Sequence, residues 1–286
     1  MRVRGGYAAL YSAAVFFAFS SLAVKLASRY YSGMFISAVR FAVGTALCVL
    51  VLAARYRSLK PVRPGLVALR GLFGALSMAM TYVAISMTGP GRAALLSNTY
   101  PLFVALFGSA FFGEKPSARV FLCVAICTGG AVLVMRDGSG ASLAGDLVAI
   151  GSAVFAGIGV NLVRRGTKTE NPFMLYLSPC LLGLPLFAVA PGAHAAGTAW
   201  AVPLLLLLGV GVGAFLAQAF MAIGYRSVPA GKGSVVFYLE TALTVLLGAL
   251  FAGESFNLRF GLGLALILGG LALNHVPAQG REAAAG

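Results

Sequence analysis

The sequence predicts an all-α integral membrane protein of ten transmembrane helices, arranged as two inverted repeats of five helices. Three observations lead to this fold class. Hydrophobic residues make up 60% of the chain and charged residues only 10%, a balance that a soluble protein could not bury. The apolar stretches run to roughly 20 residues, which suits helices, whereas barrel strands need about 10 alternating ones. Finally, the second half of the chain repeats the first.

The repeat is visible in glycine and glutamate motifs at an offset of 140 residues. Gly113-Glu114 recurs as Gly253-Glu254, and the pair Gly129-Gly130 recurs as Gly269-Gly270. The middle slips by about two residues, since Ala84-Ile85 matches Ala222-Ile223 best. We therefore predict a first five-helix repeat over residues 1–140 and a second over residues 141–286.

Ten apolar segments have the length to cross a bilayer. In chain order they cover residues 6–28, 32–54, 64–88, 91–112, 117–135, 143–165, 171–190, 199–226, 229–251 and 255–276. The first run is longer than the core of a signal peptide and has a counterpart at 143–165, so we expect it to be retained. Five spans per repeat is an odd number, so the second repeat must insert with the opposite orientation.

Proline and glycine mark where these spans begin, bend and pack. Pro90 and Pro229 begin spans four and nine, where a helix tolerates proline. The glycine pairs of spans five and ten predict close helix contact or, for some of them, a dimer contact. Pro101 within span four and Pro185 within span seven remove a backbone hydrogen bond each, which makes them candidate hinges.

The charges predict how the chain lies in the membrane. Lys and Arg number 21 against 7 Asp and Glu. With the N-terminus inside, most basic residues fall in the inner loops and adjoining helix ends, a set in which we include Arg70. This bias predicts ten spans with both termini cytoplasmic. Anionic lipid headgroups explain the basic charge better than nucleic acid, which we do not expect as a partner.

One acid lies where a membrane should not tolerate it. Glu240 falls near the middle of span nine, while the other acids lie in loops, tails or helix ends. A charged carboxyl there costs roughly 2.5–3.5 kcal/mol on insertion scales, so it should face a partner or a wet cavity. Two interpretations stay open: contact with a substrate amine or a proton, or a neutral or paired carboxyl that joins helices.

Polar and aromatic residues at similar depth predict a central site between the repeats. The repeat counterpart of Glu240 is Tyr100. In a continuous helix, residues two apart point about 200° from each other, so one member of each pair Asn98/Tyr100 and Tyr238/Glu240 should be structural. The candidate substrate-binding residues are Arg40, Tyr82, Asn98, Tyr100, Gln218, Tyr238 and Glu240.

Glu114 and Glu254 end spans four and nine at opposite faces, each five residues before an arginine. They could cap the next helix or form a gating ion pair with that arginine. The four cysteines lie in apolar spans without neighbouring metal ligands, so we expect no metal and no cofactor. Because no catalytic set occurs at membrane depth, we do not expect an enzyme. Monomer and homodimer are equally compatible with the chain.

These motifs resemble the drug/metabolite transporter superfamily, specifically its EamA-type ten-helix members. The resemblance is carried by the duplicated Gly-Glu endings, by the late Gly-Gly pairs, and by Tyr100-Pro101, Leu239-Glu240 and Ala38-Val39-Arg40-Phe41. Thr241 replaces a proline that the family often has after Leu-Glu, which puts a hinge in span nine in doubt. The resemblance implies export of small metabolites across the inner membrane by alternating access.

Within that family the chain is most similar to exporters of amino acids, including aromatic ones. An amino acid would use the carboxylate of Glu240 and the guanidinium of Arg40. A multidrug or other-metabolite exporter of the same fold, with or without proton antiport, is the alternative. A phosphorylated substrate is less expected, because Arg40 is the single cation predicted at midplane depth.

Overall fold

The computed structural model describes residues 3–56, 60–88, 90–112, 118–134, 142–187, 201–252 and 258–275. In the first repeat the helices are α1 (Val3–Ala27), α2 (Gly33–Val51) with the π-helical turn η1 (Leu52–Tyr56), α3 (Pro64–Thr88), α4 (Pro90–Ser97), α5 (Tyr100–Phe112) and α6 (Ala118–Val134). In the second repeat they are α7 (Leu143–Gly166), α8 (Pro172–Phe187), α9 (Ala201–Tyr225), α10 (Ala230–Val235), α11 (Tyr238–Ala252) and α12 (Leu258–His275).

The described helices form ten rods, which match the ten spans that the sequence predicts. Six stretches are long and apolar enough to cross a bilayer unaided: Val3–Ala27, Gly33–Tyr56, Pro64–Thr81, Leu143–Gly166, Ala201–Tyr225 and Ala230–Gly248. Three apolar helices are shorter: Ala118–Leu133, Pro172–Pro185 and Gly261–Asn274. The tenth rod is the pair α4 and α5, which together cover residues 90–112.

The rods predicted as spans four and nine are each broken in the middle. The first break is the turn Asn98–Thr99 between α4 and α5, and the second is the turn Val236–Phe237 between α10 and α11. At both breaks, backbone N–H groups donate to the carbonyl oxygen three residues earlier in the chain. Examples are Thr99 N to Leu96 O at the first break and Phe237 N to Ser234 O at the second. Pro101 therefore lies in the first turn of α5, where proline fits. The second break forms without a proline.

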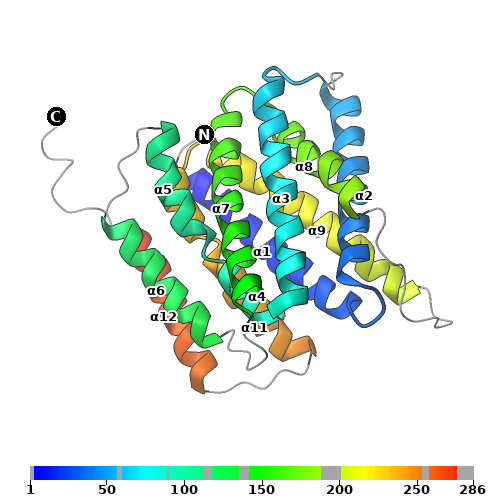
Figure 1. The fold of residues 1–286 in the computed structure, drawn as a ribbon. Helices are drawn as coiled ribbons and strands as arrows, with labels where there is room; N and C mark the ends of the chain where they lie inside the picture. Colours follow the sequence, from blue (N-terminus) through cyan, green and yellow to red (C-terminus); the bar gives the residue numbers. More distant parts are fainter. Residues whose placement is uncertain are drawn as a thin grey trace, which may run out of the picture.

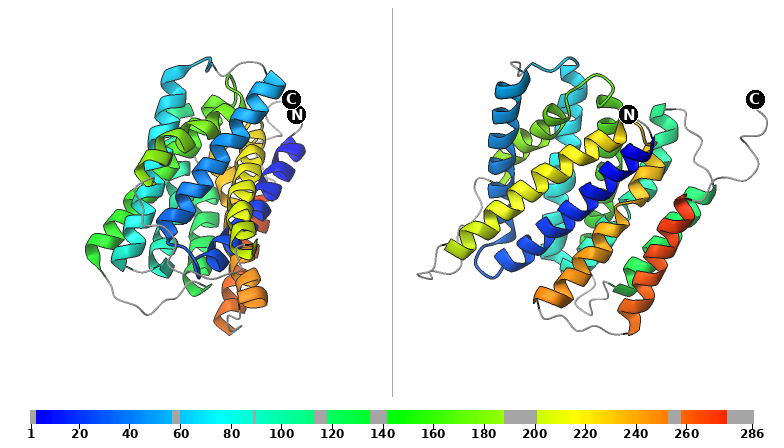
Figure 2. Two further views of the ribbon diagram at one scale, coloured as in Figure 1. Left: turned by 90° about the vertical axis from the view of Figure 1, so that its right-hand side faces the viewer. Right: turned by 180° about the vertical axis from the view of Figure 1, so that it is seen from behind.

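The two repeats pack as symmetry-related copies (Figures 1 and 2). Helix α1 runs along α9, and its counterpart α7 runs along α3. The same exchange relates the α5–α7 contact to the α11–α1 contact, and the α3–α8 contact to the α9–α2 contact. Two pairs, α2 with α8 and α6 with α12, join a helix to its own counterpart. The pseudo-twofold axis therefore passes between the two members of each of these pairs.

Helices α6 and α12 lie side by side at one flank of the bundle (Figures 1 and 2). A Cβ on Gly130 would meet the carbonyl oxygen of Gly263 at 2.6 Å, and a Cβ on Gly270 would overlap Sγ of Cys127. The Cys127 thiol itself donates to the carbonyl of Ile267, 140 residues away, at 3.6 Å. These glycines let the two backbones approach closely, as small residues do in membrane helices.

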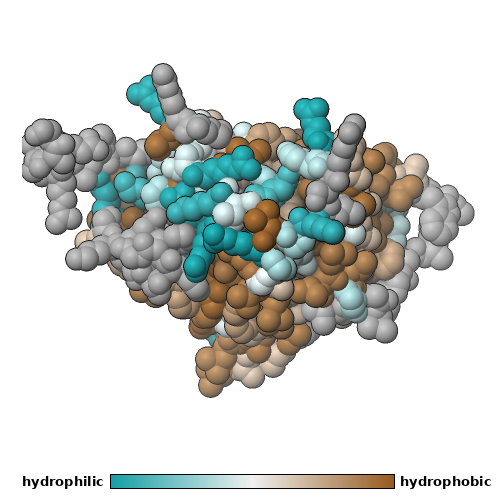
Figure 3. Space-filling view, turned by 90° about the horizontal axis from the view of Figure 1, so that it is seen from above, coloured by the Kyte–Doolittle hydropathy of each residue, from teal (hydrophilic) through white to brown (hydrophobic). Residues whose placement is uncertain are grey.

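Polar residues gather at one end of the bundle. The α2–α3 and α7–α8 connections and the end of α9 all lie at this end (Figure 1), which is seen face-on in Figure 3 as a hydrophilic patch bordered by apolar flanks. Glu170 in the α7–α8 connection accepts hydrogen bonds from the backbone N–H groups of Val62 and Arg63 in the α2–α3 connection. The buried Glu170 side chain thus joins the two repeats.

The short helices before the two breaks have different surroundings. Helix α4 packs against α3 and α7, whereas its counterpart α10 packs mainly against α5 and α6. The repeats are therefore alike in their long helices and unlike at the broken ones.

Candidate functional site

A cavity of about 510 Å³ lies at the centre of the bundle, beside both broken helices. Its walls come from α1, α2, α3, α4 and the start of α5 in the first repeat and from α7, α8, α9 and α11 in the second, together with the turns at the two breaks. Sites for small molecules typically have volumes of roughly 300–1,000 Å³. The cavity therefore has room for a metabolite of moderate size.

Five of the candidate binding residues line this cavity: Arg40, Asn98, Tyr100, Gln218 and Glu240. Asn98 and Tyr100 both face it, although a continuous helix would point them apart. The break explains this difference, because Asn98 lies in the turn and Tyr100 begins α5. The Asn98 amide donates to the hydroxyl of Thr241 at 3.5 Å, which connects the first break to α11.

Tyr238, also predicted as a binding residue, is not among the residues that line the cavity. Its side chain is 2% exposed and its hydroxyl hydrogen-bonds to that of Thr128 on α6 at 2.7 Å. Tyr238 and Glu240 are both in the first turn of α11, so the 200° separation expected between them holds there. Tyr238 therefore anchors α11 to α6.

Other candidate residues fall outside the cavity or outside the described part of the structure. Tyr82 is on α3, but its side chain lies outside the described residues, as do Glu114 and Glu254. Pro101 is buried in the first turn of α5. Pro185 lies inside α8 together with Pro179, and Pro179 lines the cavity.

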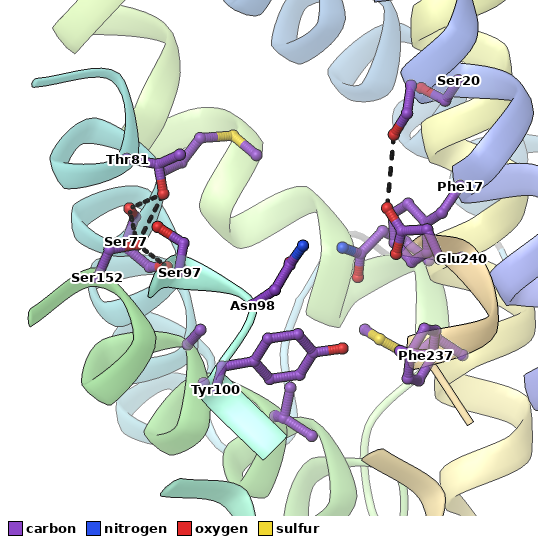
Figure 4. Close-up of a pocket in the computed structure, with 18 of the residues that line it drawn as sticks. Phe17, Ser20, Ser77, Thr81, Ser97, Asn98, Tyr100, Ser152, Phe237 and Glu240 are labelled. Carbon is purple, nitrogen blue, oxygen red and sulfur yellow. Dashed lines mark hydrogen bonds between the residues drawn. The ribbon is translucent and has the colours of Figure 1, made fainter. Parts of the chain in front are cut away.

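Glu240 lies at one side of the cavity, in the first turn of α11. A helix N-terminus favours a negative charge at this position. Ser21 on α1 donates to the carboxylate at 3.4 Å. The rings of Phe17 and Phe237 flank it and meet edge to face, with centroids 6.0 Å apart. In Figure 4, the Tyr100 and Asn98 side chains extend from the opposite wall towards Glu240 and Phe237.

Hydroxyl groups cover the wall formed by α3, α4 and α7 (Figure 4). Ser152 donates to the carbonyl of Ser77 at 2.8 Å, and its oxygen is 2.7 Å from the hydroxyl oxygen of Thr81. The Ser97 hydroxyl has no hydrogen-bond partner among the described residues. Short hydroxyl side chains give no strong sequence signal in an apolar helix, so this wall was not predicted.

Arg70 is the most important residue that the sequence prediction misplaced. We assigned it to the cytoplasmic helix ends, but it is 6% exposed and lines the cavity. On insertion scales an arginine at membrane depth costs roughly 2.5–3.5 kcal/mol, so such residues face cavities or partners. Its position, about two turns into α3, was compatible with either place. Only the packing around it decides.

Arg40 enters the cavity from α2. Its Nη1 donates to the sulfur of Met78 on α3 at 3.6 Å. Arg40 also interacts electrostatically with Glu240. Among the described residues that line the cavity, the charged side chains are Arg40, Arg70 and Glu240.

Ten helical rods in two inverted copies, with charged and hydroxyl side chains in the cavity between them, are the architecture of a multi-pass membrane transporter. The model of the EamA-like transporter family matches the chain twice, over residues 4–136 and 143–275. The chain belongs to this family. The double match also places one family unit in each half of the molecule.

Several characterised and uncharacterised proteins are similar to the chain. The pseudopaline exporter CntI of Pseudomonas aeruginosa is 28% identical over 220 residues, which are 75% of this chain and 76% of that protein. An uncharacterized transporter of Helicobacter pylori is 25% identical over 291 residues, with 93% of each chain covered. A solved crystal structure has a TM-score of 0.79 at 20% identity and covers 94% of this chain and 96% of its own, which supports the fold.

Proposed function

We propose that this transporter exports amino acids, aromatic ones included, across the bacterial inner membrane, with both termini in the cytoplasm. The observation that carries the proposal is the presence of both Glu240 and Arg40 in the lining of one cavity. An amino acid has an ammonium that suits a carboxylate and a carboxylate that suits a guanidinium. Both partners of a zwitterion are therefore present in one site.

The surroundings of Glu240 suit an apolar or aromatic side chain. Phe17 and Phe237 form an edge-to-face pair there, and Met221 also lines the cavity. Aromatic rings prefer such edge-to-face or offset contacts, which add about 0.5–1.5 kcal/mol beyond their buried area. An aromatic substrate ring would extend this cluster.

Two features support alternating access around this site. Transporters with inverted repeats bind substrate near broken helices at the repeat interface, and here both breaks border the cavity. The different packing of α4 and α10 gives the two repeats unequal arrangements at the broken helices. Exchanging these arrangements between the repeats would change which membrane face the cavity can open to, as alternating access requires.

A counterflow assay tests the proposal. Purified protein in proteoliposomes is preloaded with a mixed amino-acid pool, and uptake of each labelled amino acid is measured in turn. We expect saturable uptake that requires the preloaded pool, with aromatic and other neutral amino acids among the substrates. Absence of counterflow for every amino acid, from protein shown to be folded, would overturn the amino-acid proposal.

The second candidate is an exporter of drugs or of other metabolites, and the similarity to a pseudopaline exporter favours the metabolite branch. A hydrophobic cation would suit the aromatic pair and Glu240, but it would also face Arg40 and Arg70. The resistance profile of a deletion strain separates these cases, since a drug exporter protects against toxic cations and an amino-acid exporter against toxic amino-acid analogues.

A further inference from the structure

The guanidinium of Arg70 is directed into the protein rather than towards the near membrane surface. Arg70 is in the second turn of α3, close enough to the helix start for the side chain to snorkel outwards. It lies instead over Gly74, one turn deeper, where a Cβ would overlap its Nη1. A Cβ on Gly159 of α7 would also be 3.6 Å from this atom. Gly74 thus leaves room for a charged group at the cavity, whereas a Cβ on Gly159 would make only an ordinary van der Waals contact with it.

This guanidinium has unused hydrogen-bonding capacity. The side chain is buried, and its Nε has no hydrogen-bond partner among the described residues. A guanidinium has five N–H donors in a fork that fits carboxylate and phosphate. A buried charged donor without a partner is costly, so an anion that enters the cavity would satisfy it.

Arg70 and Arg40 lie about one helical turn apart along α3. Arg70 covers Gly74, and Arg40 reaches Met78, four residues further on, which corresponds to roughly 6 Å along a helix axis. Tyr176 on α8 lines the cavity together with both arginines. Of the two arginines, Arg40 is the one that interacts electrostatically with Glu240.

We infer that the cavity selects amino acids that carry a second anionic group. The ammonium contacts Glu240, the α-carboxylate contacts Arg40, and the second anion contacts Arg70 and Tyr176. This inference rests on the proposed function and names the substrate class of the same site. The two arginines against one glutamate give the walls an excess of positive charge, which a zwitterion alone would leave uncompensated. The second anion is a carboxylate or a phosphate, since both match a guanidinium fork.

Matched substrate pairs test the inference in the same counterflow assay. Glutamate is compared with glutamine for a second carboxylate, and phosphoserine with serine for a phosphate. For wild-type protein we expect kcat/KM to be at least about tenfold higher for the anionic member of a pair, the value of one charge-assisted contact. The pair with the larger ratio identifies the anion.

Arg70→Gln removes the charge, and Arg70→Lys keeps it. We expect Arg70→Gln to lower kcat/KM for the preferred anionic member about tenfold, with little change for its neutral partner, and Arg70→Lys to restore part of the loss. Equal losses for both members would show a structural role for Arg70 and overturn the inference. If Arg70→Gln fails to insert, the wild-type pair ratios alone decide.

The possible failures are distinguishable. Wild-type counterflow with glutamine and serine equal to that with glutamate and phosphoserine would overturn this inference and leave the amino-acid proposal standing. Absence of counterflow with both members of both pairs and with the mixed pool would overturn the proposal and the inference together.

Discussion

At the scale of single residues, Glu240 combines three properties that make it the centre of the site. It lies in the first turn of α11, it accepts a hydrogen bond from Ser21, and it interacts electrostatically with Arg40 across the cavity. A carboxylate in such a place can bind an ammonium or carry a proton. Neither role requires a metal or a cofactor.

Replacing this carboxylate distinguishes the two roles. We expect Glu240→Gln to lower amino-acid counterflow at least about tenfold, because a charge-assisted contact with the substrate ammonium is lost. If Glu240 is also the proton site, an imposed pH gradient will no longer drive uptake by this variant. Uptake is measured with and without the gradient in the same vesicles.

Ser21→Ala is the matched control, since it removes the 3.4 Å hydrogen bond and keeps the carboxylate. We expect this variant to keep its response to the gradient. If uptake by Glu240→Gln is still driven by the pH gradient, proton coupling depends on another group.

At the scale of elements, the two broken rods border the cavity, whereas the α6–α12 pair packs the two repeats together. The breaks at Asn98–Thr99 and Val236–Phe237 border the cavity with turns instead of regular helix, and only the first lies next to a proline. The α6–α12 pair lies at the flank and joins the repeats through close backbone contact at Gly130 and Gly270. This contact should contribute to stability rather than to substrate binding.

Adjacent glycines on α6 provide a matched test of this contact. We expect Gly130→Ala to destabilise the protein by about 1–3 kcal/mol, because the new Cβ would meet the Gly263 carbonyl at 2.6 Å. Gly129→Ala should be neutral or stabilising, since a Cβ there meets nothing within 4 Å and alanine favours the helix by about 1 kcal/mol. Thermal unfolding in detergent gives the comparison, and equal midpoints for the two variants would contradict it.

At the scale of the whole molecule, the inverted repeats and the charge pattern predict the same orientation of the chain in the membrane. The α2–α3 and α7–α8 connections lie at one end of the bundle although they belong to opposite repeats (Figure 1). Both carry basic residues, for example Arg63 and Lys168. The basic loops follow the second span of the first repeat and the first span of the second, as opposite insertion requires.

Cysteine labelling checks this orientation in intact cells. The four native cysteines are buried, so background labelling should be low. We expect a membrane-impermeant maleimide to label Arg29→Cys, in the exposed α1–α2 connection, from outside. Lys168→Cys, in the exposed α7–α8 connection, should react only after the cells are made permeable. The reverse pattern would place the N-terminus outside.

The sequence by itself determined the membrane class, the duplication and most of the helices. The hydrophobic content and the length of the apolar segments are local quantities, and the repeat offset of 140 residues follows from comparing the sequence with itself. The sequence also predicted Glu240 and Arg40 as candidate binding residues, because charged groups inside apolar spans are rare enough to be conspicuous.

Only the tertiary structure decided which side chains share the cavity. Tyr238 is two residues from Glu240 but faces α6, since the helix turns it away. Asn98 and Tyr100 face the cavity together because a turn interrupts the helix between α4 and α5. Arg70 enters the interior because Gly74 leaves space for its guanidinium. Each of these outcomes depends on contacts between segments far apart in the chain, and such contacts leave no mark on local sequence patterns.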